Sequence, residues 1–128
     1  MVVDTSALMA IFLGETDRDR FVEIILEAGK PLLSAVTLVE AANVLESRRG
    51  KASVLELDLF LHETKMEIVS VDAHQADQAR SGFRKYGKGR HPAALNFGDC
   101  FTYALAVVSG EAVLAKGEEF RRAGLTTL

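Results

Sequence analysis

The hydrophobic positions of this chain fall into two kinds of segment: short apolar runs and longer stretches with a helical repeat. The short runs are rich in Val, Ile and Leu, as buried strands are. The longer stretches repeat apolar residues every three or four positions, which is typical of amphipathic helices. The pattern predicts strands at residues 1–4, 31–34, 66–71 and 112–115, with a fifth candidate at 125–128.

Helices are predicted between these strands. They cover residues 6–13, 17–28, 37–49, 53–64, 73–86 and 97–109. The last of them is apolar on almost every side, so we expect it to be packed on both sides in the core. Strands that alternate with helices indicate a parallel sheet. We therefore predict a three-layer α/β/α fold with four to five short central strands, as a single domain over residues 1–128.

Acidic residues follow four of the apolar runs. They are Asp4, Glu40, Asp99 and the adjacent pair Glu118 and Glu119. Carboxylates normally lie in solvent, because a buried unpaired charge is costly. Asp4 and the adjacent pair come directly after strands, and open parallel sheets bind ligands beyond the carboxyl ends of their strands. Acids gathered there would repel one another unless a cation such as Mg²⁺, which prefers oxygen ligands, neutralised them.

For the first two acids a purely structural role is also open. Asp4 can cap the helix that follows it, unless Thr5 or Ser6 does so and leaves Asp4 free as a metal ligand. Glu40 can lie at the exposed edge of an apolar helical stripe. Alternatively, it faces the pocket with Asn43 one turn later.

The remaining acids have structural alternatives too. Asp99 can be the first-turn acid of a helix capped by Asn96. It also lies at the mouth of an apolar helix with few other polar groups, among them Thr102, where it could hold a cation. Glu118 and Glu119 can form a solvated turn, or Glu119 can begin a small helix and direct its carboxylate toward the strand ends.

Positive residues are concentrated in one segment, although the net charge is -3. The cluster consists of Arg80, Arg84, Lys85, Lys88, Arg90 and His91. It is either a solvated helix face and loop or a rim that grips phosphates. The negative net charge argues against broad coating of nucleic acid, but it does not argue against a few specific contacts.

Several classes of protein are excluded by motif and composition. The single cysteine, Cys100, cannot form an internal disulfide and favours a reducing compartment. No apolar run reaches roughly 18 residues and no secretion signal is visible, so we expect a cytoplasmic protein without a membrane partner. Zinc-ligand spacing, a nucleophile elbow and glycine-rich phosphate loops are all missing. Metal chemistry with oxygen ligands remains.

Four ordered motifs contain these acids. They are Val-Val-Asp4-Thr-Ser-Ala-Leu, Thr37-Leu-Val-Glu40-Ala-Ala-Asn43-Val-Leu, Asn96-Phe-Gly-Asp99-Cys-Phe-Thr-Tyr-Ala-Leu-Ala and Leu114-Ala-Lys-Gly-Glu-Glu-Phe120. At these separations they resemble the PIN domain and, more narrowly, the VapC toxins of bacterial type II toxin–antitoxin systems. The resemblance implies an endoribonuclease that depends on Mg²⁺ or Mn²⁺.

The resemblance also implies roles for individual residues. Asp4, Glu40 and Asp99 match the three best-defined acids of the family, and Glu119, with Glu118 beside it, is the candidate for the fourth. We expect Asp4 and Asp99 to bind the principal metal ion and the glutamates to complete the site. Water activated by the metal would attack the RNA phosphate in line.

Two further groups of residues support this expected site. Hydrogen bonds to the carboxylates are expected from Thr5, Ser6, Asn43 and Thr102. Contacts to RNA phosphates are expected from Arg84, Lys85, Lys88, Arg90 and Lys116.

The resemblance implies protein partners as well. These are a cognate VapB-like antitoxin that blocks the pocket, a second copy in a homodimer, and a toxin–antitoxin hetero-oligomer. In the fourth predicted helix, we expect Leu55 and Leu59 to face inward, with Leu57 and Phe60 as further candidates. Together with Leu61 they exceed what one helix face can bury, so either core packing or an interface between copies accounts for them.

Two rival functions remain open. One is a Mg²⁺-dependent phosphohydrolase or phospho-acceptor domain in which Asp4 is phosphorylated. Thr5 occupies the place where such sites usually have a second acid, and Lys116 is the only feature that favours this function. The other is a PIN-like module that binds RNA or a protein partner without cleaving RNA.

Overall fold

Four short strands form a parallel sheet in the order β3-β2-β1-β4. They are β1 (Val2–Val3), β2 (Leu32–Ser34), β3 (Glu67–Val69) and β4 (Val113–Leu114). The structure is a computed structural model that describes residues 1–128. The fifth candidate strand contributes only an isolated bridge, between Thr127 and Val113.

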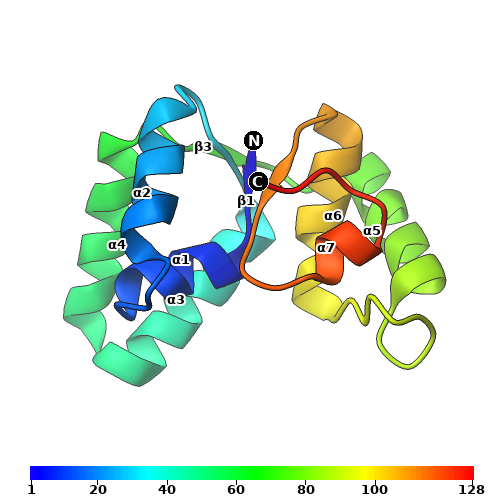
Figure 1. The fold of residues 1–128 in the computed structure, drawn as a ribbon. Coiled ribbons are helices and arrows are strands. Elements are labelled where there is room, and N and C mark those ends of the chain that lie inside the picture. The colour runs from blue at the N-terminus through cyan, green and yellow to red at the C-terminus, as the bar shows by residue number, and fades with distance from the viewer.

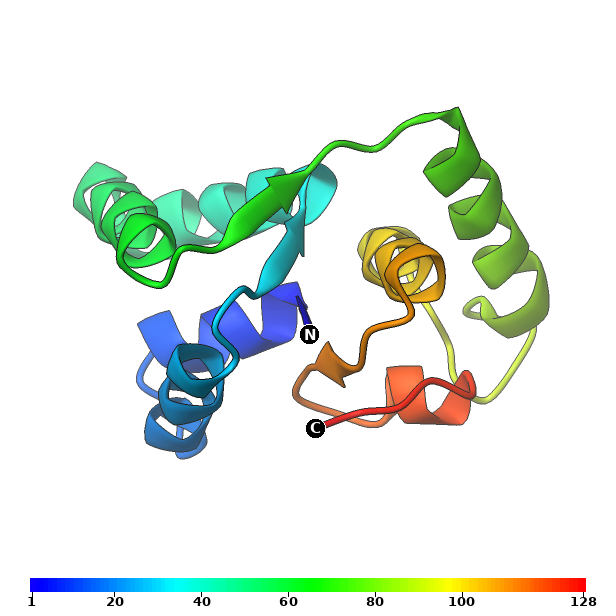
Figure 2. The same ribbon diagram turned by 90° about the horizontal axis from the view of Figure 1, so that it is seen from above.

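Seven helices flank this sheet (Figure 1). They are α1 (Thr5–Phe12), α2 (Arg18–Glu27), α3 (Ala35–Arg49), α4 (Lys51–Glu63), α5 (Ala73–Tyr86), α6 (Phe97–Ser109) and α7 (Glu119–Arg122). Helices α1 to α4 cover one face, and α5 to α7 lie on the other side (Figure 2). The predicted three-layer α/β/α arrangement is confirmed. None of the helices combines the length and apolarity that crossing a membrane requires.

The strand side chains are divided between two hydrophobic cores. Val3, Leu33 and Leu114 pack with α1 to α4, whereas Val2 and Val113 pack with α5 to α7. This division follows from the strand geometry, because successive side chains point to opposite faces of a sheet. Burial on both faces explains why β1 and β4 are continuous apolar runs. The edge strand β3, by contrast, begins with Glu67 and is largely exposed.

Helix α4 buries a different face from the one predicted. Leu55 and Leu59 are 70% and 57% exposed, so the expectation that they face inward is wrong. Leu57 and Leu61 are buried instead, together with Ser53. These three positions recur every four residues and share one side of the helix. The two exposed leucines leave an apolar strip on the surface of α4.

Helices α5 and α6 pack closely against each other. A Cβ atom at Gly82 of α5 would lie 2.6 Å from Cδ1 of Tyr103, so only glycine allows this approach. The middle of α6 is buried, as predicted for a core helix. Its ends are not, since Phe97, Val107 and Val108 are exposed.

Successive strands are added on one side of β1 and then on the other. The chain runs from β1 through β2 to β3, and then returns to place β4 on the other side of β1. Open α/β sheets bind ligands at such a switch point, outside the carboxyl ends of the strands. Asp4 follows β1 directly, and the loop that leads to Glu119 follows β4. The topology therefore brings two of the predicted acids to the same edge of the sheet.

Candidate active site

Asp4 is the cap of α1 and is only 4% exposed. Its Oδ2 accepts hydrogen bonds from the Ser6 backbone N–H (3.0 Å) and the Ser6 hydroxyl (2.7 Å). Its Oδ1 accepts from the Thr102 hydroxyl at 2.7 Å. The alternative in which Thr5 or Ser6 caps the helix is therefore wrong. A carboxylate offers about four acceptor positions, so three hydrogen bonds leave Asp4 one for a further ligand.

Glu40 lies on α3 and is directed toward the N-terminus of α6. The Thr5 hydroxyl donates a hydrogen bond to its Oε1. Its carboxylate lies directly against Gly98, where an added Cβ would be 2.7 Å from Oε1. Because Gly98 has no side chain, the Glu40 carboxylate can occupy this space. Glu40 is therefore held between α1 and α6.

Asp99 has the structural role considered for it, and the other acids influence the pKa of its carboxyl group. It forms a capping box with Asn96: its Oδ2 accepts the Asn96 N–H at 3.0 Å, and the Asn96 Oδ1 accepts the Asp99 N–H at 2.9 Å. Burial raises the pKa of the Asp99 carboxyl to about 6, although the hydrogen bond from Asn96 lowers it. The negative charges of Asp4, Glu119 and Glu40 raise it further. Four acids from distant segments thus share one electrostatic environment.

The two glutamates after β4 have different surroundings. Glu118 forms an ion pair with Arg121, one turn further along the chain. Glu119 begins α7 and folds back over Gly117, where an added Cβ would lie 3.2 Å from its Cδ. Of the two, only Glu119 contributes to the raised pKa of Asp99. Because Glu118 is paired with Arg121, Glu119 is the better placed of the two to act as the fourth acid.

Three of the four hydroxyl and amide side chains predicted to support the acids do contact a carboxylate. Thr5 donates to Glu40, while Ser6 and Thr102 donate to Asp4. Asn43 does not, because it is exposed and makes no side-chain hydrogen bond. It borders a surface groove that Glu40 also lines.

Thr37 is a further buried hydroxyl that the sequence pattern did not mark as part of the site. Its Oγ1 lies 3.4 Å from the Thr102 Oγ1, and Thr102 in turn donates to Asp4. This contact joins α3 to α6 behind the acidic group. The sequence feature that could have identified Thr37 is its position on the buried side of α3, three residues before Glu40.

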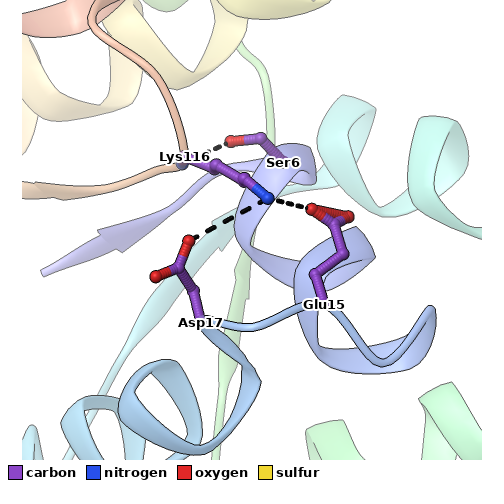
Figure 3. A network of polar contacts seen from close by, with 4 residues as sticks. All are labelled: Ser6, Glu15, Asp17 and Lys116. Atoms are coloured by element: carbon purple, nitrogen blue, oxygen red, sulfur yellow. Dashed lines mark hydrogen bonds and ion pairs between the residues drawn. The ribbon is translucent and has the colours of Figure 1, made fainter.

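Lys116 connects the loop after β4 to the segment that follows β1 (Figure 3). Its backbone N–H donates to the Ser6 hydroxyl oxygen at 2.9 Å. Its ammonium group pairs with Glu15 and lies 4.0 Å from a carboxylate oxygen of Asp17 (Figure 3). The hydrogen bond to Glu15 raises the pKa of the Lys116 ammonium. Because two carboxylates hold it, this lysine is poorly placed for the predicted contact with RNA phosphate.

The other four residues predicted to bind RNA are differently placed. Arg84 and Lys85 lie in the last turn of α5, and Lys88 and Arg90 lie in the loop that follows. All four are exposed, and none belongs to an ion pair. Their positive charges are therefore available to an anionic ligand.

The donor set of the acidic group fits a hard divalent cation. Asp4, Glu40, Asp99 and Glu119 supply only carboxylate oxygens, and none of them is paired with a lysine or arginine. No three His, Cys, Asp or Glu side chains are close enough together to hold a metal ion as they stand. Hydrogen bonds hold Asp4, Asp99 and Glu40, whereas no hydrogen bond holds the Glu119 carboxylate. The side chains are of the type that binds a metal ion, but their carboxylates do not converge on one point.

Known structures share this fold. The structure of Mycobacterium tuberculosis VapC20, described as a toxin that cleaves the sarcin-ricin loop, aligns with a TM-score of 0.80 at 20% identity. The alignment covers 99% of this chain and 97% of that one. VapBC2 from Rickettsia felis, solved with a DNA fragment from its promoter, aligns with a TM-score of 0.73 at 17% identity over 99% of this chain and 96% of that chain. At these identities the likeness establishes the fold alone.

Sequence relatives establish the family. The PIN domain family model matches residues 1–125. The VapC ribonuclease Mb0640 of Mycobacterium bovis is 48% identical over 129 residues, which cover 100% of this chain and 98% of that protein. Ribonuclease VapC of Mycolicibacterium smegmatis is 50% identical over 121 residues, or 94% of each chain. The chain therefore belongs to the PIN-domain family and, within it, to the VapC ribonucleases.

Proposed function

We infer that this protein is an endoribonuclease of the VapC type, the toxin of a type II toxin–antitoxin pair. Its full-length relation to VapC ribonucleases supports the activity. The observation that supports the assignment of the site is the gathering of acids from separate segments: Glu40 accepts from Thr5, next to Asp4, and lies against Gly98, next to Asp99. Burial raises the pKa of Asp99, and Asp4, Glu119 and Glu40 raise it further. Carboxylates without counter-cations at the switch point of the sheet are what a metal-dependent nuclease requires.

We propose Mg²⁺ or Mn²⁺ as the cofactor, in keeping with the divalent-metal dependence general among PIN-domain ribonucleases. Asp4 and Asp99 would hold the ion, and Glu40 and Glu119 would complete its surroundings directly or through water. When bound, such an ion lowers the pKa of a coordinated water and offsets charge on the phosphate oxygens.

The chain's own residues contribute orientation and proton transfer. Ser6 and Thr102 fix the Asp4 carboxylate from two sides, and the capping box fixes Asp99. Such preorganised groups need little rearrangement when charge develops in the transition state. Glu40 and Glu119 would orient the attacking water and accept its proton, because a carboxylate within hydrogen-bond reach can act as a general base.

The rival phospho-acceptor function loses the feature that favoured it. Lys116 is engaged with Glu15 and Asp17, so its ammonium does not serve Asp4. The residue after Asp4 is also Thr5 rather than the second acid that such sites usually have. A PIN-like module that binds without cleaving has no comparable use for four acids that are unpaired with cations.

We also propose the partners that the VapC family suggests. A VapB-like antitoxin would cover the acidic site, and the apolar strip formed by Leu55 and Leu59 on α4 offers a surface for a homodimer. A toxin–antitoxin hetero-oligomer would combine both contacts. The site of action would be the cytoplasm, where such a toxin meets its RNA.

The direct test is to incubate purified, antitoxin-free protein with total RNA and to map the new ends. We expect discrete cleavage products with millimolar Mg²⁺ or Mn²⁺ and none with EDTA. A thermal shift should accompany this, because a ligand that binds only the folded state raises the melting temperature. Intact RNA under every metal condition would overturn the assignment.

Glu119→Gln and Glu118→Gln form a matched pair of neighbouring substitutions. We expect Glu119→Gln to lower the rate of RNA cleavage by about 10-fold or more, because loss of a group that supports a metal typically costs 10- to 100-fold. Glu118→Gln should leave the rate within about twofold, because Glu118 is engaged with Arg121. Equal losses in the two variants would contradict the separation of these carboxylates.

Gly98→Ala tests the position of Glu40. The new methyl group would lie 2.7 Å from the Glu40 Oε1 and would displace the carboxylate. We expect cleavage to fall by about 10-fold or more. The melting temperature should change little, because alanine has about 1 kcal/mol more helix propensity than glycine, which offsets the cost of displacing the carboxylate. Single-turnover cleavage and circular dichroism measure the two effects. Full activity in this variant would show that Glu40 has no part in the reaction.

A further inference from the structure

A groove of about 590 Å³ lies between α5 and α6. Aromatic rings form much of its wall, contributed by Phe83, Phe97 and Phe101. Arginines stand along it, namely Arg80, Arg84 and Arg90. No acidic residue lines it. Its volume is in the range of sites that hold small organic groups.

Phe97 joins this arginine-lined groove to the acidic site. It is 75% exposed, the largest value among the exposed large hydrophobic residues. Its ring is paired with that of Phe101 in a T-shaped arrangement, at a centroid distance of 5.0 Å. Phe97 also lines a second groove, together with Gly98 and Glu40. Phe97 therefore lies two positions before Asp99 in the sequence and lines one groove together with Glu40.

Two of the three arginines of the groove are free to bind an anion. Arg84 and Arg90 form no ion pair, whereas Arg80 lies 3.5 Å from Asp77. The Arg90 guanidinium lies over the Phe83 ring, 5.3 Å from its centroid, which keeps it near the groove. Guanidinium groups bind phosphates through paired N–H donors.

The combination of ring faces and free guanidinium groups favours one class of ligand. Proteins that bind single-stranded nucleic acids stack bases on exposed aromatic rings and hold the backbone with positive side chains. Paired RNA does not present its base faces to a ring. A protein partner would have to place acidic side chains opposite Arg84 and Arg90 and also cover the Phe97 ring.

We propose that this groove holds an unpaired base of the RNA substrate, stacked on Phe97, with Arg84 and Arg90 binding the adjoining phosphates. The proposal rests on the ribonuclease activity inferred above. It adds the side chains that would receive an unpaired nucleotide and its phosphates, in a groove that none of the four acids lines.

Binding without cleavage tests the proposal. The probe is a fluorescein-labelled 2′-O-methyl oligonucleotide of mixed sequence, added to metal-free protein as a single strand or annealed to its complement. Fluorescence anisotropy should show the single strand bound about 10-fold or more tightly than the duplex. Phe97→Ala should weaken single-strand binding roughly 5- to 100-fold, the range typical of one base stacked on an aromatic ring.

Two further variants separate stacking from a general loss of apolar surface. Phe97→Trp keeps a stacking ring and should bind within about threefold of the unchanged protein. Leu26→Ala removes a similarly exposed apolar side chain from α2 and should bind as the unchanged protein does. A probe that carries 2-aminopurine should be quenched on binding to the unchanged protein and to Phe97→Trp, but not to Phe97→Ala.

Several results would overturn the proposal. They are binding by Phe97→Ala within about twofold of the unchanged protein, equal affinity for the duplex, and no binding of the probe at all. A drop in sedimenting mass in Phe97→Ala, in step with weaker binding, would assign the ring to an interface between copies instead. The cleavage assay on total RNA is a separate readout: no products from the unchanged protein refute the ribonuclease activity. Normal cleavage with unaltered Phe97→Ala binding refutes only the stacking site.

Discussion

Asp99→Asn should abolish RNA cleavage and at the same time make the metal-free protein more stable. The pKa of Asp99 rises from 3.8 to about 6 in the folded protein, so its ionised form is disfavoured there. The folded state therefore holds this proton more tightly than the unfolded state, and metal-free stability falls as the pH rises from about 4 to about 6. Above that range the cost is fully present, about 1–2 kcal/mol after allowance for solvent screening. An asparagine removes it and can still accept the Asn96 N–H.

Melting curves and cleavage rates measure this prediction together. At neutral pH without metal, Asp99→Asn should melt roughly 5 °C higher than the unchanged protein, and its melting temperature should lose the fall between pH 4 and 6. Mg²⁺ should stabilise the unchanged protein but not the variant. Asp58→Asn, on the exposed side of α4, is the control and should alter neither property. A destabilised Asp99→Asn would mean that its carboxylate serves the capping box alone.

Asp4→Asn should also abolish cleavage, but it should destabilise the protein. Each Asp4 oxygen accepts a hydroxyl hydrogen bond, from Ser6 on one side and Thr102 on the other. An amide has one acceptor oxygen and presents N–H donors in place of the other. Because the site is buried, the mismatch should cost about 1–3 kcal/mol. We expect the rate to fall at least about 100-fold, since a proposed metal ligand is lost.

The control for Asp4→Asn is the same substitution at another helix cap. Asp72 caps α5 and accepts the Gln75 N–H at 2.8 Å, but it is exposed. Asparagine is as good a cap as aspartate, so Asp72→Asn should leave stability and cleavage unchanged. Denaturant unfolding of the pair isolates the cost of the buried contacts at Asp4. Equal stability of the two variants would show that the hydroxyl contacts contribute nothing.

Local signals explain which parts of the fold were predictable. The bounds of α5 and α6 were predicted because Asp72 and Asn96 are strong caps placed directly before them. Helix α3 begins two residues earlier than predicted, because Ser34 ends β2 and also caps the helix. The buried face of α4 could not be read from its sequence. Leucines occur on both sides of that helix, and only its packing on the first core selects Leu57 and Leu61.

The candidate site was predictable to a similar extent. Strand ends and family-like motifs identified the acids. In the structure Glu40 lies against Gly98, next to Asp99, and the charges of Asp4, Glu119 and Glu40 raise the pKa of Asp99. The choice between Glu118 and Glu119 needed the structure, because it depends on how the chain turns after Gly117 and on the ion pair with Arg121. The engagement of Lys116 was hidden for the same reason. Its partners, Glu15 and Asp17, lie about a hundred positions away in the sequence.

The insertion of β4 beside β1 divides the proposed catalytic acids between two parts of the chain. Asp4 and Glu40 precede the connection from β3 to α5, and Asp99 and Glu119 follow it. A nascent chain on the ribosome carries no complete set until residue 119 has been made and the last strand has docked against the first. The translating cell would thus be spared an active nuclease on unfinished chains, and either part produced separately would be harmless.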